Sequence, residues 1–170
     1  MAADVKYWGH WIFEGGRRQI EPCYPLDAQG HHAIAYLWAR TVRCPNPTCG
    51  ATVPLVRQFW LSNKTNRKLA IRMDCRGKDG RAGFSICEGP DIDFDPANGT
   101  AIKGKACCPF CGQVSDGKYL KAESSAGRLG QQLLAVAEPR PDGKSKVYRA
   151  PTDTDMRAYE QASEQLRRWK

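Results

Sequence analysis

Two short stretches decide how this 170-residue chain is interpreted: Cys44-Pro-Asn-Pro-Thr-Cys49-Gly50, the first knuckle, and Cys108-Pro-Phe-Cys111-Gly112, the second knuckle. Each consists of a cysteine, an immediate proline, a second cysteine and then a glycine. The intervening four and two residues fall within the usual spacing of zinc-binding cysteine pairs. Proline stiffens such a turn, and glycine can adopt the left-handed conformation at its exit. The spacing predicts that Cys44, Cys49, Cys108 and Cys111 bind one structural Zn²⁺, as in a zinc ribbon.

The chain has eight cysteines in all, and the other four fit ligation less well. Cys23, Cys75 and Cys87 stand alone, which is typical of small buried apolar residues. Cys107 competes with Cys108 as a ligand, and we favour Cys108 because it repeats the pattern of the first knuckle. Four cysteine ligands leave no open position for a substrate, so the predicted site is structural. A disulfide-stabilised protein remains the alternative, although no export signal is visible.

The charge balance favours anionic partners. Lys and Arg number 26 against 18 Asp and Glu, a formal net charge of +8, which promotes association with nucleic acid. No apolar run approaches the roughly 20 residues that span a bilayer. The first residues lack the basic start and apolar core of a signal peptide. We therefore expect a cytoplasmic protein that does not contact a membrane.

Hydrophobic periodicity predicts an α+β fold: a small, mostly antiparallel zinc-ribbon β module flanked by an N-terminal and a C-terminal helix. The expected helices span residues 4–20 and 153–168, the latter with a capping box at Thr152 and Asp155. The expected strands span residues 33–43, 51–61, 68–75, 83–87, 99–106, 131–138 and 144–150, with a polar turn at 62–67 and a hairpin turn at 139–143. Three segments result: 1–32 (helix and linker), 33–125 (zinc-ribbon module) and 126–170 (hairpin and helix).

The densest basic stretch lies between the two knuckles. Side chains in such turns are often only solvated, and the alternative is contact with phosphates. The candidate nucleic-acid contacts are Arg57, Lys64, Arg67, Lys68 and Arg72. The chain has neither a phosphate-binding loop nor a nucleophile elbow, and the segment 95–100 fits a turn better than a cofactor loop. We identify no catalytic residue.

Beyond these motifs, the chain resembles the zinc-ribbon insert of adenine-specific DNA methylases. The resemblance is specific over residues 36–61, which include the first knuckle and Phe59-Trp60-Leu61. Supporting matches are the second knuckle, Ala126-Gly-Arg-Leu-Gly130, Tyr148-Arg-Ala-Pro-Thr152 and the leading Tyr7-Trp-Gly-His-Trp-Ile12.

The resemblance implies a parent enzyme that transfers methyl from S-adenosylmethionine to adenine N6, in restriction or anti-phage defence. It also implies that the cofactor loop and the catalytic Asp/Asn-Pro-Pro-Tyr motif flank the insert. Neither is present here, and the eleven prolines include no adjacent pair. The expected role is therefore an accessory, non-catalytic module that contacts DNA.

The expected partner is a methyltransferase core or a partner subunit, which would pack against the terminal helices, including Tyr7, Trp8 and Trp11. Two alternatives stay open: a stand-alone nucleic-acid-binding zinc ribbon, and the non-catalytic half of a split methyltransferase that assembles in trans.

Overall fold

The computed structural model describes residues 2–27, 30–77, 79–140 and 145–168. It confirms an α+β fold in which helices flank antiparallel sheets. The helices are α1 (Ala2–Ile20), α2 (Gly117–Ser125) and α3 (Asp153–Arg167), with short 3-10 turns η1 (Glu21–Cys23) and η2 (Gly89–Asp91). The strands are β1 (Ala35–Arg43), β2 (Thr52–Pro54), β3 (Trp60–Lys64), β4 (Arg67–Asp74), β5 (Gly83–Glu88), β6 (Ala101–Ile102), β7 (Lys105–Cys107), β8 (Val114–Ser115), β9 (Gly130–Pro139) and β10 (Lys146–Arg149).

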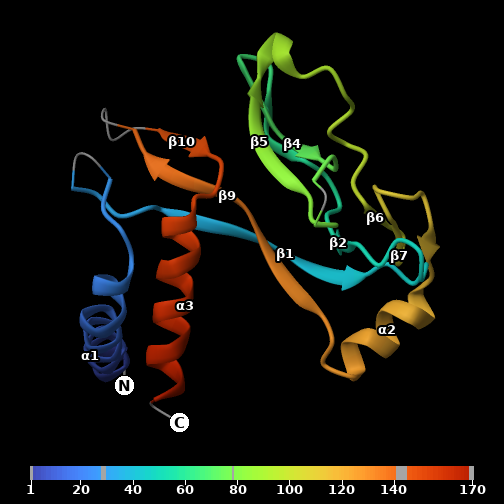
Figure 1. Ribbon diagram of the computed structural model, residues 1–170. Coiled ribbons are helices and arrows are strands. Elements are labelled where there is room, and N and C mark those ends of the chain that lie inside the picture. The colour runs from blue at the N-terminus through green and yellow to red at the C-terminus, as the bar shows by residue number, and fades with distance from the viewer. Residues whose placement is uncertain (1, 28–29, 78, 141–144, 169–170) are drawn as a thin grey trace.

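A long antiparallel pair, β1 with β9, runs through the molecule. Its register extends from Ala35 opposite Ala137 to Thr41 opposite Gly130, and β10 and β2 complete a sheet of order β10-β9-β1-β2. Helices α1 and α3 lie at one end of this pair and α2 lies at the other (Figure 1). The pairing joins the predicted segments 33–125 and 126–170 in one sheet.

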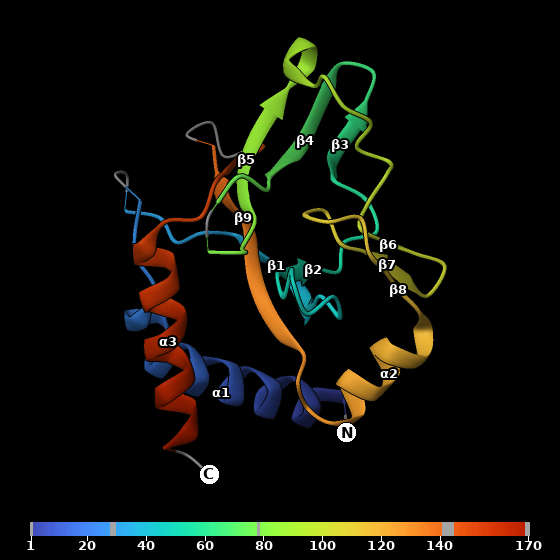
Figure 2. The same ribbon diagram turned by 45° about the vertical axis from the view of Figure 1, so that its right-hand side comes forward.

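A second sheet, β3-β4-β5, packs on this pair and forms the main core. Figure 2 shows it rising from the β1–β9 ribbon. Its Ile71 is buried with Ala39 of β1 and with Leu134 and Ala135 of β9. Partly buried apolar side chains of both sheets, among them Leu37 of β1 and Ile86 of β5, pack against this cluster, so the two sheets bury a shared apolar layer.

The third sheet, β6-β7-β8, lies at the end of the molecule that carries the knuckles. There Val42, Val53, Cys44 and Cys108 are buried together. Tyr119 of α2 packs against this cluster, and its hydroxyl donates to the carbonyl of Arg43 at 3.0 Å. The first cysteine of each knuckle is therefore buried in a small apolar core.

Two predicted strands are wrong in extent. Residues 51–61 divide into β2 and β3 because the backbone between them bonds to the segment 96–101: Phe59 N–H donates to Pro96 at 2.7 Å, and Ala101 N–H donates to Val56 at 2.9 Å. Residues 99–106 form a hairpin of β6 and β7 instead of one strand. The chain reverses there at Lys103 and Gly104, which have φ values of 49° and 76°.

The polar turn expected at residues 62–67 is shorter, because β3 continues to Lys64 and β4 begins at Arg67. The remaining boundaries lie close to those expected, and both hydrogen bonds of the capping box at Thr152 and Asp155 are present. Strands β9 and β10 pair antiparallel, but residues 141–144 of the expected hairpin turn lie outside the described residues. Across the described ranges, we find no helix with both the length and the apolar character needed to cross a membrane.

Candidate metal centre

The two knuckles close with the same backbone hydrogen bond. The N–H of Cys44 donates to the carbonyl of Ala51, and the N–H of Cys108 donates to the carbonyl of Gln113, both at 2.8 Å. Each acceptor lies two residues beyond the second cysteine of its knuckle. The glycine between them has a φ of +54° in the first knuckle and +76° in the second, a conformation that side chains disfavour. The shared sequence pattern therefore folds into the same closed turn twice.

The structure brings the four predicted ligands together. The Sγ atoms of Cys44 and Cys111 are 3.6 Å apart, those of Cys49 and Cys108 are 3.8 Å apart, and all four lie within 4.8 Å of one another. A tetrahedron with sulfurs about 2.3 Å from its centre has edges of about 3.8 Å. This group of residues, the four-cysteine cluster, could hold a metal ion, and its dimensions match tetrahedral coordination.

The surroundings of these thiols disfavour four free thiolates. Burial raises the pKa of Cys44 to about 12 and also raises the pKa of Cys108. At the exposed Cys111, a hydrogen bond from the backbone of Gln113 lowers the thiol pKa to about 7. Thiolates are the ligating form, so a divalent cation that binds here displaces protons and neutralises part of the negative charge.

The remaining cysteines lie outside this cluster in the described part of the chain. Cys107 is exposed, and its sulfur approaches the carbonyl of Gly112 at 3.6 Å, which supports the choice of Cys108. Cys87 is buried, as expected, and accepts a hydrogen bond from Arg72 Nε at 3.1 Å. Cys23 and Cys75 are half-buried.

Three of the basic candidates gather at the β3–β4 hairpin. Lys64 pairs with Arg67 in the register of the two strands, and Lys68 follows on β4. Lys64 and Lys68 are exposed, whereas Arg67 donates to the carbonyl of Lys146 at 3.0 Å. Arg57 is exposed in the loop between β2 and β3. The hairpin therefore presents a compact basic tip, defined by Lys64, Arg67 and Lys68.

Arg72, the fifth candidate, has contacts within the chain. Its Nη2 atom lies 2.7 Å from Asp93 Oδ1 and donates to the carbonyl of Asp91 at 2.6 Å, and its guanidinium lies 5.7 Å from the Phe94 ring centroid. The hydrogen bond to Cys87 and the charge of Asp93 raise the pKa of Arg72. This arginine ties β4 to the segment after η2, which the sequence did not indicate.

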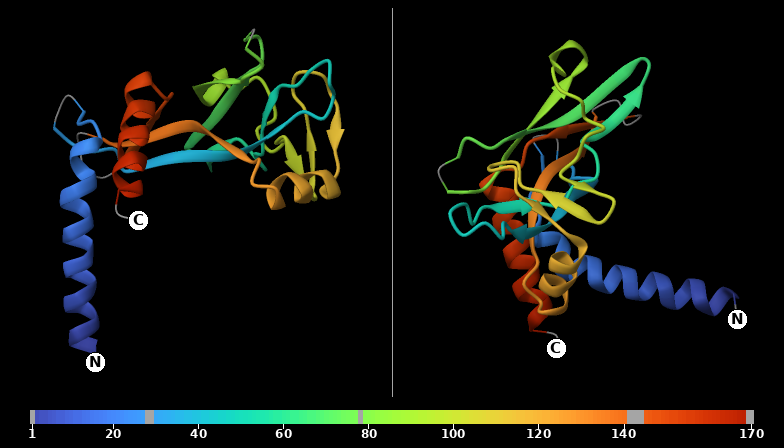
Figure 3. Two further views of the ribbon diagram at one scale, coloured as in Figure 1. Left: turned by 60° about the horizontal axis from the view of Figure 1, so that its bottom comes forward. Right: turned by 90° about the vertical axis from the view of Figure 1, so that its right-hand side faces the viewer.

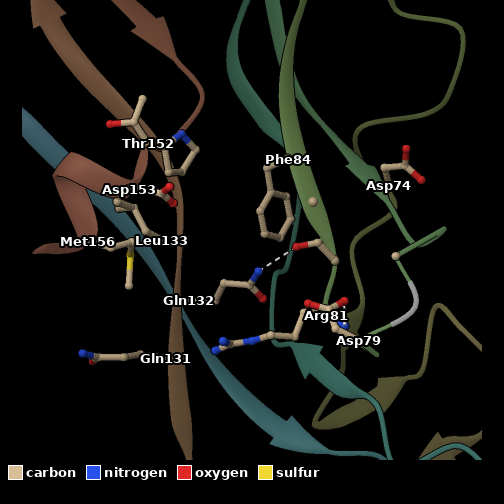
Figure 4. A pocket seen from close by; sticks show the side chains of 14 residues that line it. Asp74, Asp79, Arg81, Phe84, Gln131, Gln132, Leu133, Thr152, Asp153 and Met156 are labelled. Carbon is tan, nitrogen blue, oxygen red and sulfur yellow. Dashed lines mark hydrogen bonds between the residues drawn. The ribbon is translucent and has the colours of Figure 1, made fainter.

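A polar pocket of about 590 Å³ lies between β9, the start of β5 and the first turn of α3 (Figure 4). Gln132 Nε2 donates there to the carbonyl of Ala82 at 2.7 Å, and Asp79 accepts from the backbone N–H of Arg81. The described residues that line it include no cysteine, histidine or serine. The pocket thus lacks the serine or cysteine beside a histidine that nucleophilic catalysis commonly uses.

Comparisons with protein-family models, with curated proteins and with solved structures find no match to this chain.

Proposed function

We propose that this chain is a zinc-binding, non-catalytic module that contacts DNA and serves an adenine-specific DNA methyltransferase. The observation that carries the proposal is the four-cysteine cluster, whose sulfurs lie within 4.8 Å of one another. Sulfur-only tetrahedral sites in proteins select zinc or iron. Four protein ligands close the coordination shell of zinc, which is the arrangement of a structural site.

The position of the cluster supports a structural role. Cys44 follows β1 and Cys108 follows β7, so one ion would fasten the four-stranded sheet to the β6-β7-β8 sheet. Strands β6, β7 and β8 have only two or three residues each, and sheets this small bury little apolar surface. Structural zinc adds an apparent ~10–16 kcal/mol to the folding of small modules, which is enough to maintain this end of the molecule.

DNA contact is proposed for the basic tip. Lys64 and Lys68 are exposed, and the formal net charge of +8 draws the chain towards phosphates. Removing one phosphate contact lowers the slope of log affinity against log salt by about 0.9. The double variant Lys64→Gln/Lys68→Gln should therefore bind duplex DNA more weakly and with a slope smaller by about 1.8.

The matched control is Lys118→Gln/Lys121→Gln, which removes the same charge from exposed positions of α2. Fluorescence anisotropy on a labelled duplex across a salt series measures both quantities. An equal effect of the two double variants would show only a general charge effect and would remove the basic tip as a contact surface.

The assignment to a methyltransferase is supported by the sequence resemblance alone. S-adenosylmethionine and the catalytic motif would belong to the parent enzyme, and the chain would act with them in the cytoplasm. The isolated chain should therefore neither bind S-adenosylmethionine in calorimetry nor methylate adenine-containing DNA. It should form a stable complex with a methyltransferase subunit that carries the Pro-Pro-Tyr motif. Methyl transfer by the isolated chain would overturn the non-catalytic role, and failure to bind such a subunit would favour a stand-alone DNA-binding protein.

A further inference from the structure

Helix α1 carries large apolar side chains that the described chain does not cover. Val5, Trp8, Ile12 and Phe13 are between 56% and 74% exposed, and none of the described residues of the helix is buried. Figure 3 shows the helix projecting away from the sheets. Isolated helices are marginal in water, and a continuous apolar patch of this kind marks an interaction surface.

One stripe of this helix alternates large and small residues. At about 100° per residue, Val5, Gly9, Ile12 and Gly16 lie within about 60° of one another, with Trp8 and Phe13 on either side. A glycine in a helix interior costs about 1 kcal/mol relative to alanine. A Cβ atom added at Gly9 or Gly16 would meet no described atom within 4 Å. The chain by itself therefore gives these glycines no packing role, whereas a second helix could approach them closely.

We propose that α1 pairs antiparallel with α1 of a second copy of this chain. The stripe is complementary to itself in that direction: Val5 lies opposite the partner's Gly16, and Ile12 lies opposite the partner's Gly9. The same two contacts recur across a two-fold axis, as a closed dimer requires.

A groove at the base of α1 fits the same arrangement. It has a volume of about 590 Å³ and is lined by Ile12, Phe13 and Gly16 of the helix and by Tyr24 and Tyr36 beyond it. In the antiparallel pair, the partner's first two turns run along this part of α1. The partner's Val5, opposite Gly16, would then lie against the groove.

The available area sets the strength of the pair. Aromatic side chains bury about 150–250 Å² each, so Trp8 and Phe13, each more than half exposed, contribute about 100 Å² each. With Val5, Ile12 and the groove walls, two copies bury on the order of 1,000 Å², the lower range of specific interfaces. The dimer should therefore have a Kd of micromolar order.

Sedimentation equilibrium of the full chain, from about 1 to 200 µM around the expected Kd, tests the proposal. The wild type should shift from monomer to dimer. Gly9→Leu places a side chain against the partner's Ile12 and should weaken dimerisation at least about tenfold. It also raises helix propensity, so circular dichroism should show no loss of helix.

His10→Leu is the control, because it adds the same side chain about 130° away from the stripe and should leave the dimer intact. A wild type that stays monomeric at every concentration would overturn the proposal. A monomer whose α1 instead binds lipid vesicles or another protein would overturn it as well. A dimer that Gly9→Leu and His10→Leu affect equally would also overturn it. The pairing uses none of the metal ligands, so its failure would leave the zinc proposal untouched.

Discussion

Replacing Cys108 with serine should release the metal and unfold the end of the molecule that carries the knuckles. The Cys108 side chain is 2% exposed, and its sulfur lies 3.8 Å from that of Cys49, so the variant leaves three sulfurs and a buried hydroxyl that is a poorer zinc ligand. A metal present at about 1,000 times its dissociation constant stabilises the folded state by about 4.1 kcal/mol. Loss of that stabilisation is a large share of the about 5–15 kcal/mol that stabilises a typical domain.

The neighbouring Cys107→Ser is the matched control, because Cys107 is exposed and outside the four-cysteine cluster. Its free energy of unfolding should change by less than about 0.5 kcal/mol. Urea denaturation followed by circular dichroism, at a buffered free-zinc concentration, measures both variants. Equal stability of Cys108→Ser and the wild type, with zinc still bound, would refute the reasoning.

Three other perturbations test separate parts of the structure. Zinc affinity should rise with pH, because burial raises the pKa of Cys44 to about 12 and binding must displace its proton; a competition titration that shows no pH dependence would contradict this. Gly99→Ala should lower the free energy of unfolding by more than about 2 kcal/mol, because a Cβ there would clash with the carbonyl oxygen of Val56; an unchanged melting temperature would show that the loop adapts. Burial raises the pKa of Asp155, but hydrogen bonds from Arg149 and Thr152 outweigh it and hold the pKa below its ordinary value. A carboxyl with a lowered folded-state pKa stabilises the chain above its unfolded pKa and loses that contribution as pH falls, so wild-type stability should decline below about pH 4 and Asp155→Asn should remove part of the decline.

The four-cysteine cluster could be predicted from the sequence because the residues that form each of its turns are close together in the chain. Each knuckle is a short turn whose residues dictate its own geometry, and the spacing of Cys44 from Cys49 and of Cys108 from Cys111 is visible without knowledge of the fold. The convergence of the two turns is not local. It was inferred from the chemistry of zinc, which needs four ligands, and the structure agrees with it.

Helix α2 was not predicted, although the sequence contains its signals. Asp116 accepts a hydrogen bond from the N–H of Tyr119 and caps the first turn, and Gly127, with a φ of +67°, follows the last turn. These are ordinary start and stop residues. The residues that start and end this helix therefore lie within the segment itself, as do the residues that shape the second knuckle beside it.

Other features depend on contacts between distant segments, which a single sequence does not specify. The interruption between β2 and β3 arises because Val56 and Phe59 bond to residues near position 100. In the same way, Arg72 looked like a free cation until the fold placed Asp93 beside it. Charge and β propensity describe each residue alone, so they could not predict either outcome.

X-ray absorption at the zinc edge of the purified chain would decide whether the four-cysteine cluster holds a metal. We expect one zinc per chain with four sulfur neighbours at about 2.3 Å. A folded chain that contains no metal, or a zinc ion whose neighbours include nitrogen or oxygen, would contradict it.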